Sequence, residues 1–245
     1  MKKITALILT TLILLSTTSC GSANKELDYE TADRYATQGK YEEAIAAFRA
    51  LGNYKDSASR AVYCEAMSCC EAGDYSSAYN KLTTIQDYSQ TSTLLKEIFF
   101  ETRLFEALNS YKTNLKKPDS LTVSEVMFTY DAEGTKASSK ERPACIIRSS
   151  AQNGFGGYSS SYTICFDYEE ENKYTCYGSC SSLDYDDYDI DEISEGLVAA
   201  SINGHIKNIE ITDAINMDRV NRIIKKNSYS GIKRIPGLKA NDISY

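Results

Sequence analysis

The residues best suited to chemistry lie in an acidic segment of the C-terminal half. Six carboxylates stand between Asp184 and Glu192, and Asp187, Asp189 and Asp191 occupy alternate positions. Carboxylate oxygens are the ligands that calcium prefers, so these three aspartates are the predicted ligands of a metal site. The segment lacks the glycine that turns a calcium-binding loop, and tyrosines interrupt it. A solvated acidic loop is therefore the alternative interpretation.

Catalytic residues are harder to find. His205 is the chain's one histidine, so a serine or cysteine nucleophile would have no other imidazole base. It follows Gly204 in a predicted turn, where a histidine is usually exposed or structural. The NGFGG stretch at 153–157 lacks the lysine and hydroxyl residue of a phosphate loop and precedes a strand, which favours a tight turn. We predict no enzyme activity, no catalytic residue and no cofactor.

The cysteines of the C-terminal half suggest a cross-strand pair. If residues 170 and 171 form a hairpin tip, Cys165 stands opposite Cys176. This would be a hydrogen-bonded position, where the Cα atoms are farther apart, so the geometry permits a disulfide without favouring it. Cys176 and Cys180 have a CxxxC spacing, but no second Cys or His pair supports a zinc site. The cysteines of the helical half are expected to be buried thiols: Cys64, Cys69 and Cys70.

The first twenty residues indicate where the chain works. Lys2 and Lys3 precede an apolar run at 4–15, and small residues lead to Cys20. The run is shorter than the roughly 20 residues of a membrane-spanning helix, and the order of its parts is that of a secretory signal. It resembles the signal of bacterial lipoproteins, in which signal peptidase II cuts before a cysteine whose thiol carries a diacylglycerol. Thr17 departs from the leucine usual in that family.

This resemblance implies that residues 1–19 are removed and that Cys20 carries fatty acyl chains such as palmitate. Residues 20–24 would be a tether of the Gram-positive type, holding the protein on the extracytoplasmic face of the cell membrane. An ordinary secretory signal with an incidental cysteine is the alternative. The net charge of −7 argues against nucleic acid as a partner, because such binding depends on Lys and Arg neutralising phosphates.

A period of 34 residues marks the N-terminal half. Eight positions recur at this offset: Ala32, Tyr35, Gly39, Tyr41, Ala44, Phe48, Leu51 and Tyr54 correspond to Ala66, Cys69, Gly73, Tyr75, Ala78, Leu82, Ile85 and Tyr88. The pattern predicts two antiparallel helices per unit. The glycines would cap the first helix in the left-handed conformation, and the small alanines would let the second helix approach it.

In period and residue types, these units resemble the tetratricopeptide repeat. The stretches QGKYEEAIAAF and EAGDYSSAYNKL carry the likeness, although both units lack the closing proline. The resemblance implies a protein-binding groove lined by the first helix of each unit. Its predicted lining residues are Arg34, Tyr35, Gln38, Met67, Ser68 and Cys69. An ordinary helical bundle is the alternative.

The whole chain is predicted to be a multidomain α+β protein. Residues 25–116 would form the repeat domain, closed by a capping helix over 91–115. Pro118 marks a boundary, and residues 117–245 would form an α+β domain with an antiparallel sheet. Strands are expected at 144–149, 158–168 and 173–178, and helices at 193–202 and 218–226. This domain resembles small secreted α+β domains of Gram-positive surface proteins.

The function predicted from these features is a lipid-anchored, non-catalytic scaffold for a protein or peptide. Two other classes remain open. A calcium-dependent or glycan-binding surface receptor would use the acidic, tyrosine-rich segment at 184–192. An envelope hydrolase would depend on His205 and is disfavoured by the scarcity of acid–base residues.

Overall fold

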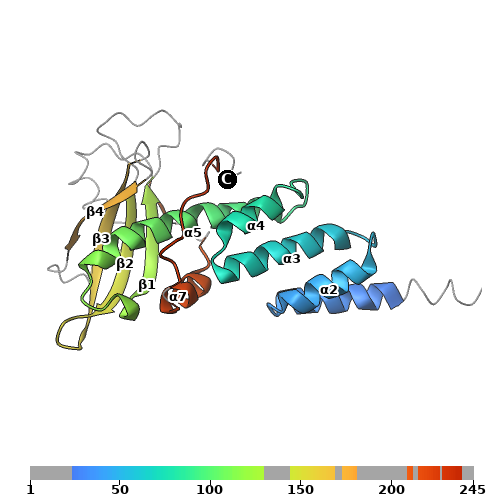
Figure 1. The fold of residues 1–245 in the computed structure, drawn as a ribbon, viewed down its shortest axis with the longest axis horizontal. Helices are drawn as coiled ribbons and strands as arrows, with labels where there is room; N and C mark the ends of the chain where they lie inside the picture. The colour runs from blue at the N-terminus through green and yellow to red at the C-terminus, as the bar shows by residue number, and fades with distance from the viewer. Residues whose placement is uncertain are drawn as a thin grey trace, which may run out of the picture. The chain divides into compact units, whose positions relative to one another are not determined.

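The computed structural model describes residues 24–129, 144–168, 173–180, 209–211, 215–226 and 228–238. It contains helices and an antiparallel sheet, so the predicted mixed α+β class is confirmed (Figure 1). The chain divides into two compact units. The first comprises residues up to Cys70 together with Ser76–Thr91, and the second comprises Glu71–Tyr75 together with Ser92–Tyr245. Within the described ranges, none of the helices combines the length and apolar character needed to cross a membrane.

Two helix pairs occupy the first half of the chain. A helix over 24–37 precedes α2 (Tyr41–Leu51), and α3 (Ser57–Ala72) precedes α4 (Tyr75–Leu82). Gly39 has a φ of 71°. Around it, the Lys40 amide donates to the Tyr35 carbonyl at 2.9 Å and the Gly39 amide donates to Ala36 at 3.0 Å. This is the Schellman pattern that ends a helix at a left-handed glycine. Gly73 has a φ of 79°, so both predicted glycine caps are confirmed.

The core of the first unit follows the repeat pattern. Ala44 and Ala78 are fully buried, as the period predicted. Phe48 packs at the centre of a cluster of small and aliphatic side chains, because the alanines leave it room. The buried members of this cluster are Ala32, Ala44, Ile45, Phe48, Leu51, Ala61 and Cys64.

The segments that follow α2 and α4 repeat in their backbone as well. The Tyr54 amide donates to Leu51 at 3.3 Å, and the Tyr88 amide donates to Ile85 at 3.0 Å. Next, the amides of Ser57 and Thr91 donate to the carbonyls of Tyr54 and Tyr88 at 3.1 and 2.9 Å. Both of these hydrogen bonds in the first link therefore have a counterpart 34 residues later. The two links form the same turn without the proline of the tetratricopeptide repeat.

A repeated tyrosine pair closes each link onto a helix. The rings of Tyr29 and Tyr54 meet edge to face with centroids 6.1 Å apart, and those of Tyr63 and Tyr88 do so at 5.5 Å. Both members of the second pair lie 34 positions after those of the first. Edge-to-face aromatic contacts are favourable beyond the area they bury. The repeat thus extends to two positions, 29 and 63, that sequence comparison did not single out.

The second unit is built on α5 (Thr91–Tyr111) and a five-stranded antiparallel sheet. The strands are β1 (Thr122–Thr129), β2 (Ala144–Gln152), β3 (Tyr158–Tyr168), β4 (Lys173–Cys180) and β5 (Ile209–Ile211), in the order β4-β3-β2-β1-β5. Short 3-10 turns at Lys112–Asn114 and Pro118–Ser120 lead from α5 to β1. The three predicted strands are confirmed. The expected helix at 193–202 lies outside the described residues.

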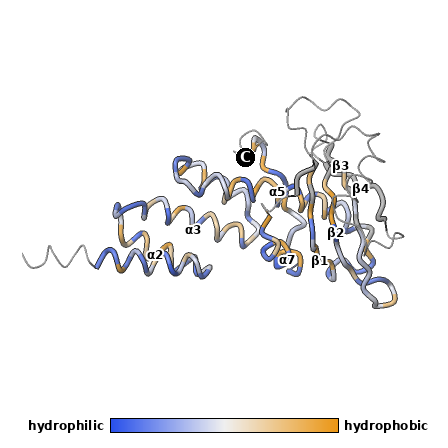
Figure 2. Tube along the Cα trace, turned by 180° about the vertical axis from the view of Figure 1, so that it is seen from behind, coloured by the Kyte–Doolittle hydropathy of each residue, from blue (hydrophilic) through white to orange (hydrophobic). Residues whose placement is uncertain are grey.

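Helix α5 is buried on nearly all sides between residues 98 and 108. Phe100 contacts Phe128 of β1, with ring centroids 5.2 Å apart. Phe105 contacts Tyr229 of the C-terminal segment at 5.8 Å. In this part of the chain, the compact units divide between Thr91 and Ser92. In Figure 2, hydrophobic residues, coloured orange, recur along α5 and along the central strands of the sheet.

The side of β3 that faces α5 carries small side chains. Thr163 and Cys165 of β3 are buried, and the Cys165 thiol lies 3.9 Å from the Ala107 carbonyl of α5. Tyr158, at the start of β3, is exposed. Small residues on the strands leave room for the aromatic side chains of α5.

Helix α7 (Met217–Lys225) confirms the helix predicted at 218–226. The Asn216 side chain caps its N-terminus by accepting from the Arg219 amide at 3.0 Å. On β1, the Val123 amide donates to the Asn221 side chain at 3.0 Å, and the Asn221 side chain donates to the Val123 carbonyl at 2.9 Å. Buried Val220, Ile223 and Ile224 give α7 its apolar face.

Candidate functional site

The predicted binding residues of the first helix are divided between its surface and the core. Arg34 and Gln38 are exposed and stand four positions apart, so they share one face of the helix. Tyr35 is half-buried and packs against the hydrophobic cluster of the first unit. The structure therefore leaves Arg34 and Gln38 available for contacts and gives Tyr35 a structural role as well.

The predicted residues of α3 point in different directions, because consecutive helical residues are about 100° apart. Ser68 donates to Glu42 of α2 at 3.4 Å, and Cys69 is half-buried. Met67 stands two turns after Arg60, which pairs with Asp33 of the first helix. Met67 shares the face of α3 that carries Arg60. A groove lined by all six of these residues stays a prediction.

A polar network that the sequence did not reveal joins the first helix to the start of α3. We call it the first-unit network, and its members are Glu26, Tyr29, Asp33, Tyr54, Lys55, Asp56 and Arg60. Tyr29 donates its hydroxyl hydrogen to Asp56 at 2.5 Å and accepts from Arg60 at 3.2 Å. Glu26 accepts from Tyr54 at 2.7 Å and from Lys55 at 2.5 Å. The Lys55 ammonium also lies 4.7 Å from the centre of the Tyr29 ring.

Ionisation in this network follows from its hydrogen bonds. Donation by Lys55 and Tyr54 lowers the pKa of Glu26. Burial and donation to Asp56 raise the pKa of Tyr29, and donation to Glu26 raises that of Tyr54. The phenols are therefore held as neutral donors and are poorly suited to act as nucleophiles. Rings and charges of this kind are suited to positioning helices and to contacting another protein.

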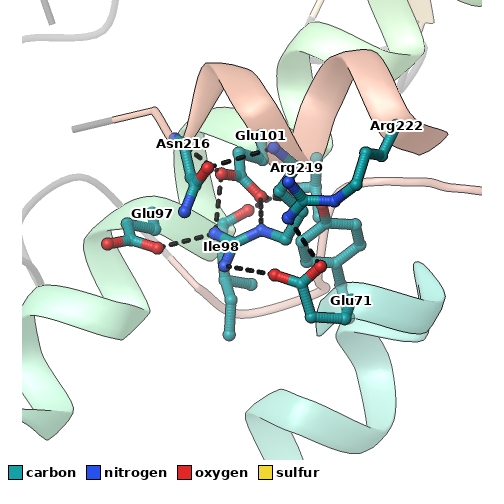
Figure 3. Close-up of polar contacts among 9 residues, drawn as sticks. Glu71, Glu97, Ile98, Glu101, Asn216, Arg219 and Arg222 are labelled. Carbon is teal, nitrogen blue, oxygen red and sulfur yellow. Dashed lines mark hydrogen bonds and ion pairs between the residues drawn. The ribbon is translucent and has the colours of Figure 1, made fainter. Parts of the chain in front are cut away.

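The most deeply buried charges lie in the second unit (Figure 3). We call this group the Arg219 cluster: Glu71, Tyr75, Glu97, Glu101, Asn216, Arg219 and Arg222. Arg219 of α7 and Glu101 of α5 are both fully buried. The guanidinium donates through Nε and Nη2 to the two oxygens of Glu101, at 3.0 and 2.7 Å. Its Nη2 also donates to Glu97 at 2.6 Å, and its Nη1 lies 4.0 Å from Glu71.

Four donors surround the Glu101 carboxylate. Besides Arg219, the Tyr75 hydroxyl donates at 2.7 Å and the Asn216 amide donates at 2.9 Å. Burial raises the pKa of Glu101, and the Arg219 guanidinium acts in the opposite direction. Because its oxygens are occupied and shielded from solvent, this carboxylate is not placed to bind a substrate. The cluster instead fastens α7 to α5 through a two-point ion pair.

The sequence did contain a signal for this cluster. Arg219 stands four positions before Ile223, on the apolar face of α7, and Glu101 interrupts the apolar run of α5 after Phe99 and Phe100. Charged residues are rarely buried unless they are paired. A charge on each of two apolar faces therefore suggests a buried pair, but 118 positions separate these two residues.

The predicted register of Cys165 and Cys176 is confirmed, but the two residues form a non-hydrogen-bonded pair and not the hydrogen-bonded pair that was expected. Cys165 stands opposite Cys176 and, on its other side, opposite Cys145. The Asn153 amide donates to the Gly157 carbonyl at 2.8 Å, which makes these two residues a hydrogen-bonded pair. Strands β2 and β3 continue from this pair without a register shift. Because hydrogen-bonded pairs recur at every second position, Cys145 and Cys165 also form one. Each residue directs both backbone groups to one neighbour, so Cys165 and Cys176 form the non-hydrogen-bonded pair. Side chains lie closer at such positions, and the disulfide stays a prediction.

The remaining candidates are not tested by the structure. Cys20, Asp187, Asp189, Asp191 and His205 lie outside the described residues. Across the ranges that are described, no group of three or more His, Cys, Asp or Glu side chains is arranged to hold a metal ion. No protein-family model, curated protein or solved structure matches the chain.

Proposed function

We propose that this chain is a lipid-anchored, non-catalytic scaffold that binds a protein or peptide through repeats of the tetratricopeptide type. The observation that supports the proposal most is the recurrence of the 34-residue period in three dimensions. In both 34-residue repeats, the first helix ends at a left-handed glycine. In both, two equivalent backbone hydrogen bonds form in the segment after the second helix, and an edge-to-face tyrosine pair packs against it. Repeats of this kind are typically used to present a binding surface to a partner.

The proposed contact surface is the exposed face of the first helix that carries Arg34 and Gln38. Met67 on α3 would extend it, because its side of α3 is the one that pairs with the first helix through Arg60. A guanidinium and an amide can bind peptide carboxylates and backbone groups, while a thioether adapts to apolar side chains. The first-unit network would hold the two helices at a fixed spacing beneath the partner.

Helix α5 would close the array. Thr91, which begins α5, stands 34 positions after Ser57, which begins α3. The position equivalent to Gly73 is Ala107, so α5 has no glycine to end it and continues to Tyr111. A third hairpin is therefore replaced by one long helix.

Site-specific photocrosslinking in intact cells tests the proposal. A photoreactive residue is placed at Gln38 and, as a matched control, at Arg49 of α2, whose side chain is 66% exposed but pairs with Glu65 of α3. We expect a protein adduct from position 38 and little from position 49. The double substitution R34A/Q38A should lower the yield from a probe at Met67, whereas R49A should not. Equal adducts from both positions would contradict the proposed surface.

A further inference from the structure

The turn between β2 and β3 exposes an aromatic side chain completely. Phe155 is 101% exposed, and Tyr158, the first residue of β3, is 65% exposed. Figure 1 shows this hairpin extending beyond the neighbouring strands. Isolated exposed apolar residues are common on protein surfaces. A phenylalanine at the end of a projecting hairpin is a stronger indication of contact when the turn and its base are also arranged for it.

The turn is held in a single conformation by Asn153. Its side-chain oxygen accepts from the Phe155 amide at 2.9 Å and from the Gly157 amide at 3.1 Å. Its backbone amide donates to Gly157 at 2.8 Å, and its carbonyl accepts from Gly156 at 3.1 Å. Gly156 has a φ of 88°, which favours glycine. Phe155 is therefore presented on a pre-organised support, which lowers the entropic cost of binding.

The base of the hairpin has a different chemistry from its end. Tyr158 stands opposite Gln152. The Lys117 ammonium donates to the Gln152 side chain at 3.2 Å, and Lys116 beside it is exposed. Exposed Asp119 is the acidic residue in this stretch. An apolar ring thus stands at the end, with a phenol and an excess of positive charge behind it.

We propose that this turn is a membrane contact, in which Phe155 enters the boundary between headgroups and acyl chains. Tyr158 and Lys117 would stay at the level of the headgroups, since tyrosine prefers that interface and lysine is attracted by anionic phosphates. This graded order favours a lipid surface over a protein pocket, which would enclose the whole side chain. The inference depends on the proposed function, because an anchor at Cys20 would hold the whole chain at the membrane.

The absence of tryptophan from the sequence permits a direct test. The full-length protein is purified with a single tryptophan, either F155W or the control L27W, whose position on the first helix is 62% exposed. Each variant is reconstituted into vesicles of phosphatidylglycerol and phosphatidylcholine. We expect the emission of F155W to shift to shorter wavelength and to be quenched by bromine on the acyl chains. L27W should remain accessible to a water-soluble quencher. Water-like emission from F155W would overturn the proposal.

A second measurement separates the turn from the anchor. The processed chain carrying C20S is mixed with the same vesicles, and bound protein is collected by sedimentation. F155A should lower its association by about tenfold, the change expected when one buried aromatic contact is removed. K117E should also weaken binding, and L27A should not. If Cys20 proves acylated while F155A has no effect, the turn proposal fails and the anchor stands. If F155A lowers binding but Cys20 proves not to be acylated, the turn proposal stands and the anchor fails.

Discussion

The first-unit network and the Arg219 cluster contain the same kinds of side chain but differ in their burial. Both combine guanidinium groups, carboxylates and tyrosine hydroxyls. In the first-unit network, the Lys55 and Glu26 side chains are 44% and 45% exposed, and Arg60 is 18% exposed. In the Arg219 cluster, Arg219 and Glu101 have no exposure at all. Burial is therefore the main physical difference between the two regions.

This difference determines how much each ion pair contributes to stability. Water and salt screen exposed pairs, which contribute about 0–1 kcal/mol each. A buried charge that loses its partner cannot recover its hydration, and the loss is typically about 3–5 kcal/mol. We expect the first unit to tolerate changes in its polar residues, as a contact surface must, and the second unit to depend on a few of them.

The largest effect is expected from Arg219. R219A should lower the free energy of unfolding by about 3–5 kcal/mol, because it leaves the Glu101 carboxylate buried without a counter-ion. R60A, its counterpart in the first-unit network, should cost about 1 kcal/mol. Urea denaturation measures both. Equal losses for the two variants would contradict the comparison.

Replacing both partners isolates the cost of an unpaired charge. The double variant E101L/R219M should be more stable than R219A, since no charge remains buried without a partner. R222A serves as a control, because the Arg222 side chain is 52% exposed and pairs with Glu71 at 2.7 Å. A double variant less stable than R219A would show that the pair itself contributes the stability.

The second-largest effect concerns the paired strands. A disulfide between Cys165 and Cys176 closes a short loop and should stabilise the chain by about 3 kcal/mol relative to its reduced form. Peptide mapping of the secreted protein without reductant should recover these two cysteines linked. C145S should leave the link intact, although the Cys145 side chain is equally buried. A Cys145–Cys165 link would contradict the assignment of the two kinds of strand pair.

The two capping glycines give a matched comparison. Both G39A and G73A force an alanine into the left-handed region, at a cost of about 1–2 kcal/mol. An added Cβ at Gly39 would meet nothing within 4 Å, whereas at Gly73 it would lie 3.3 Å from the Ile232 side chain. G73A should therefore lower the melting temperature more than G39A does. Equal shifts would indicate that Ile232 moves aside freely.

The smallest effect is the pH dependence of an ion pair in the first unit. Burial acts to raise the pKa of Glu65, but hydrogen bonds from Lys81 and Arg49 outweigh it and lower the pKa. A lowered carboxyl pKa contributes stability above the ordinary value of 4.5, and this contribution is lost as the pH falls through the folded-state pKa. E65Q should be less stable than the parent chain at pH 7, by up to about 1 kcal/mol. The difference should shrink below pH 4.5, and a growing difference would contradict the sign.

Local features of the fold were predictable from the sequence, whereas its long-range partners were not. Gly39, Gly73 and the Cys165–Cys176 register follow from period and alternation, which act over a few residues. The Arg219–Glu101 pair depends on how distant helices pack, and no period connects them. The side of β3 that faces α5 could not be chosen from the sequence for a related reason. Alternation shows that two faces differ, but the large aromatic side chains of α5 select the face with the smaller residues.

The acyl anchor is the premise shared by the scaffold, the membrane contact of Phe155 and the oxidised cysteine pair. Intact-mass measurement of the protein extracted from the membranes of its own cells tests this premise most directly. We predict a chain that begins at Cys20 and carries the mass of a diacylglycerol on that residue. A chain that retains residues 1–19, or one that begins elsewhere with no added acyl mass, would contradict the account.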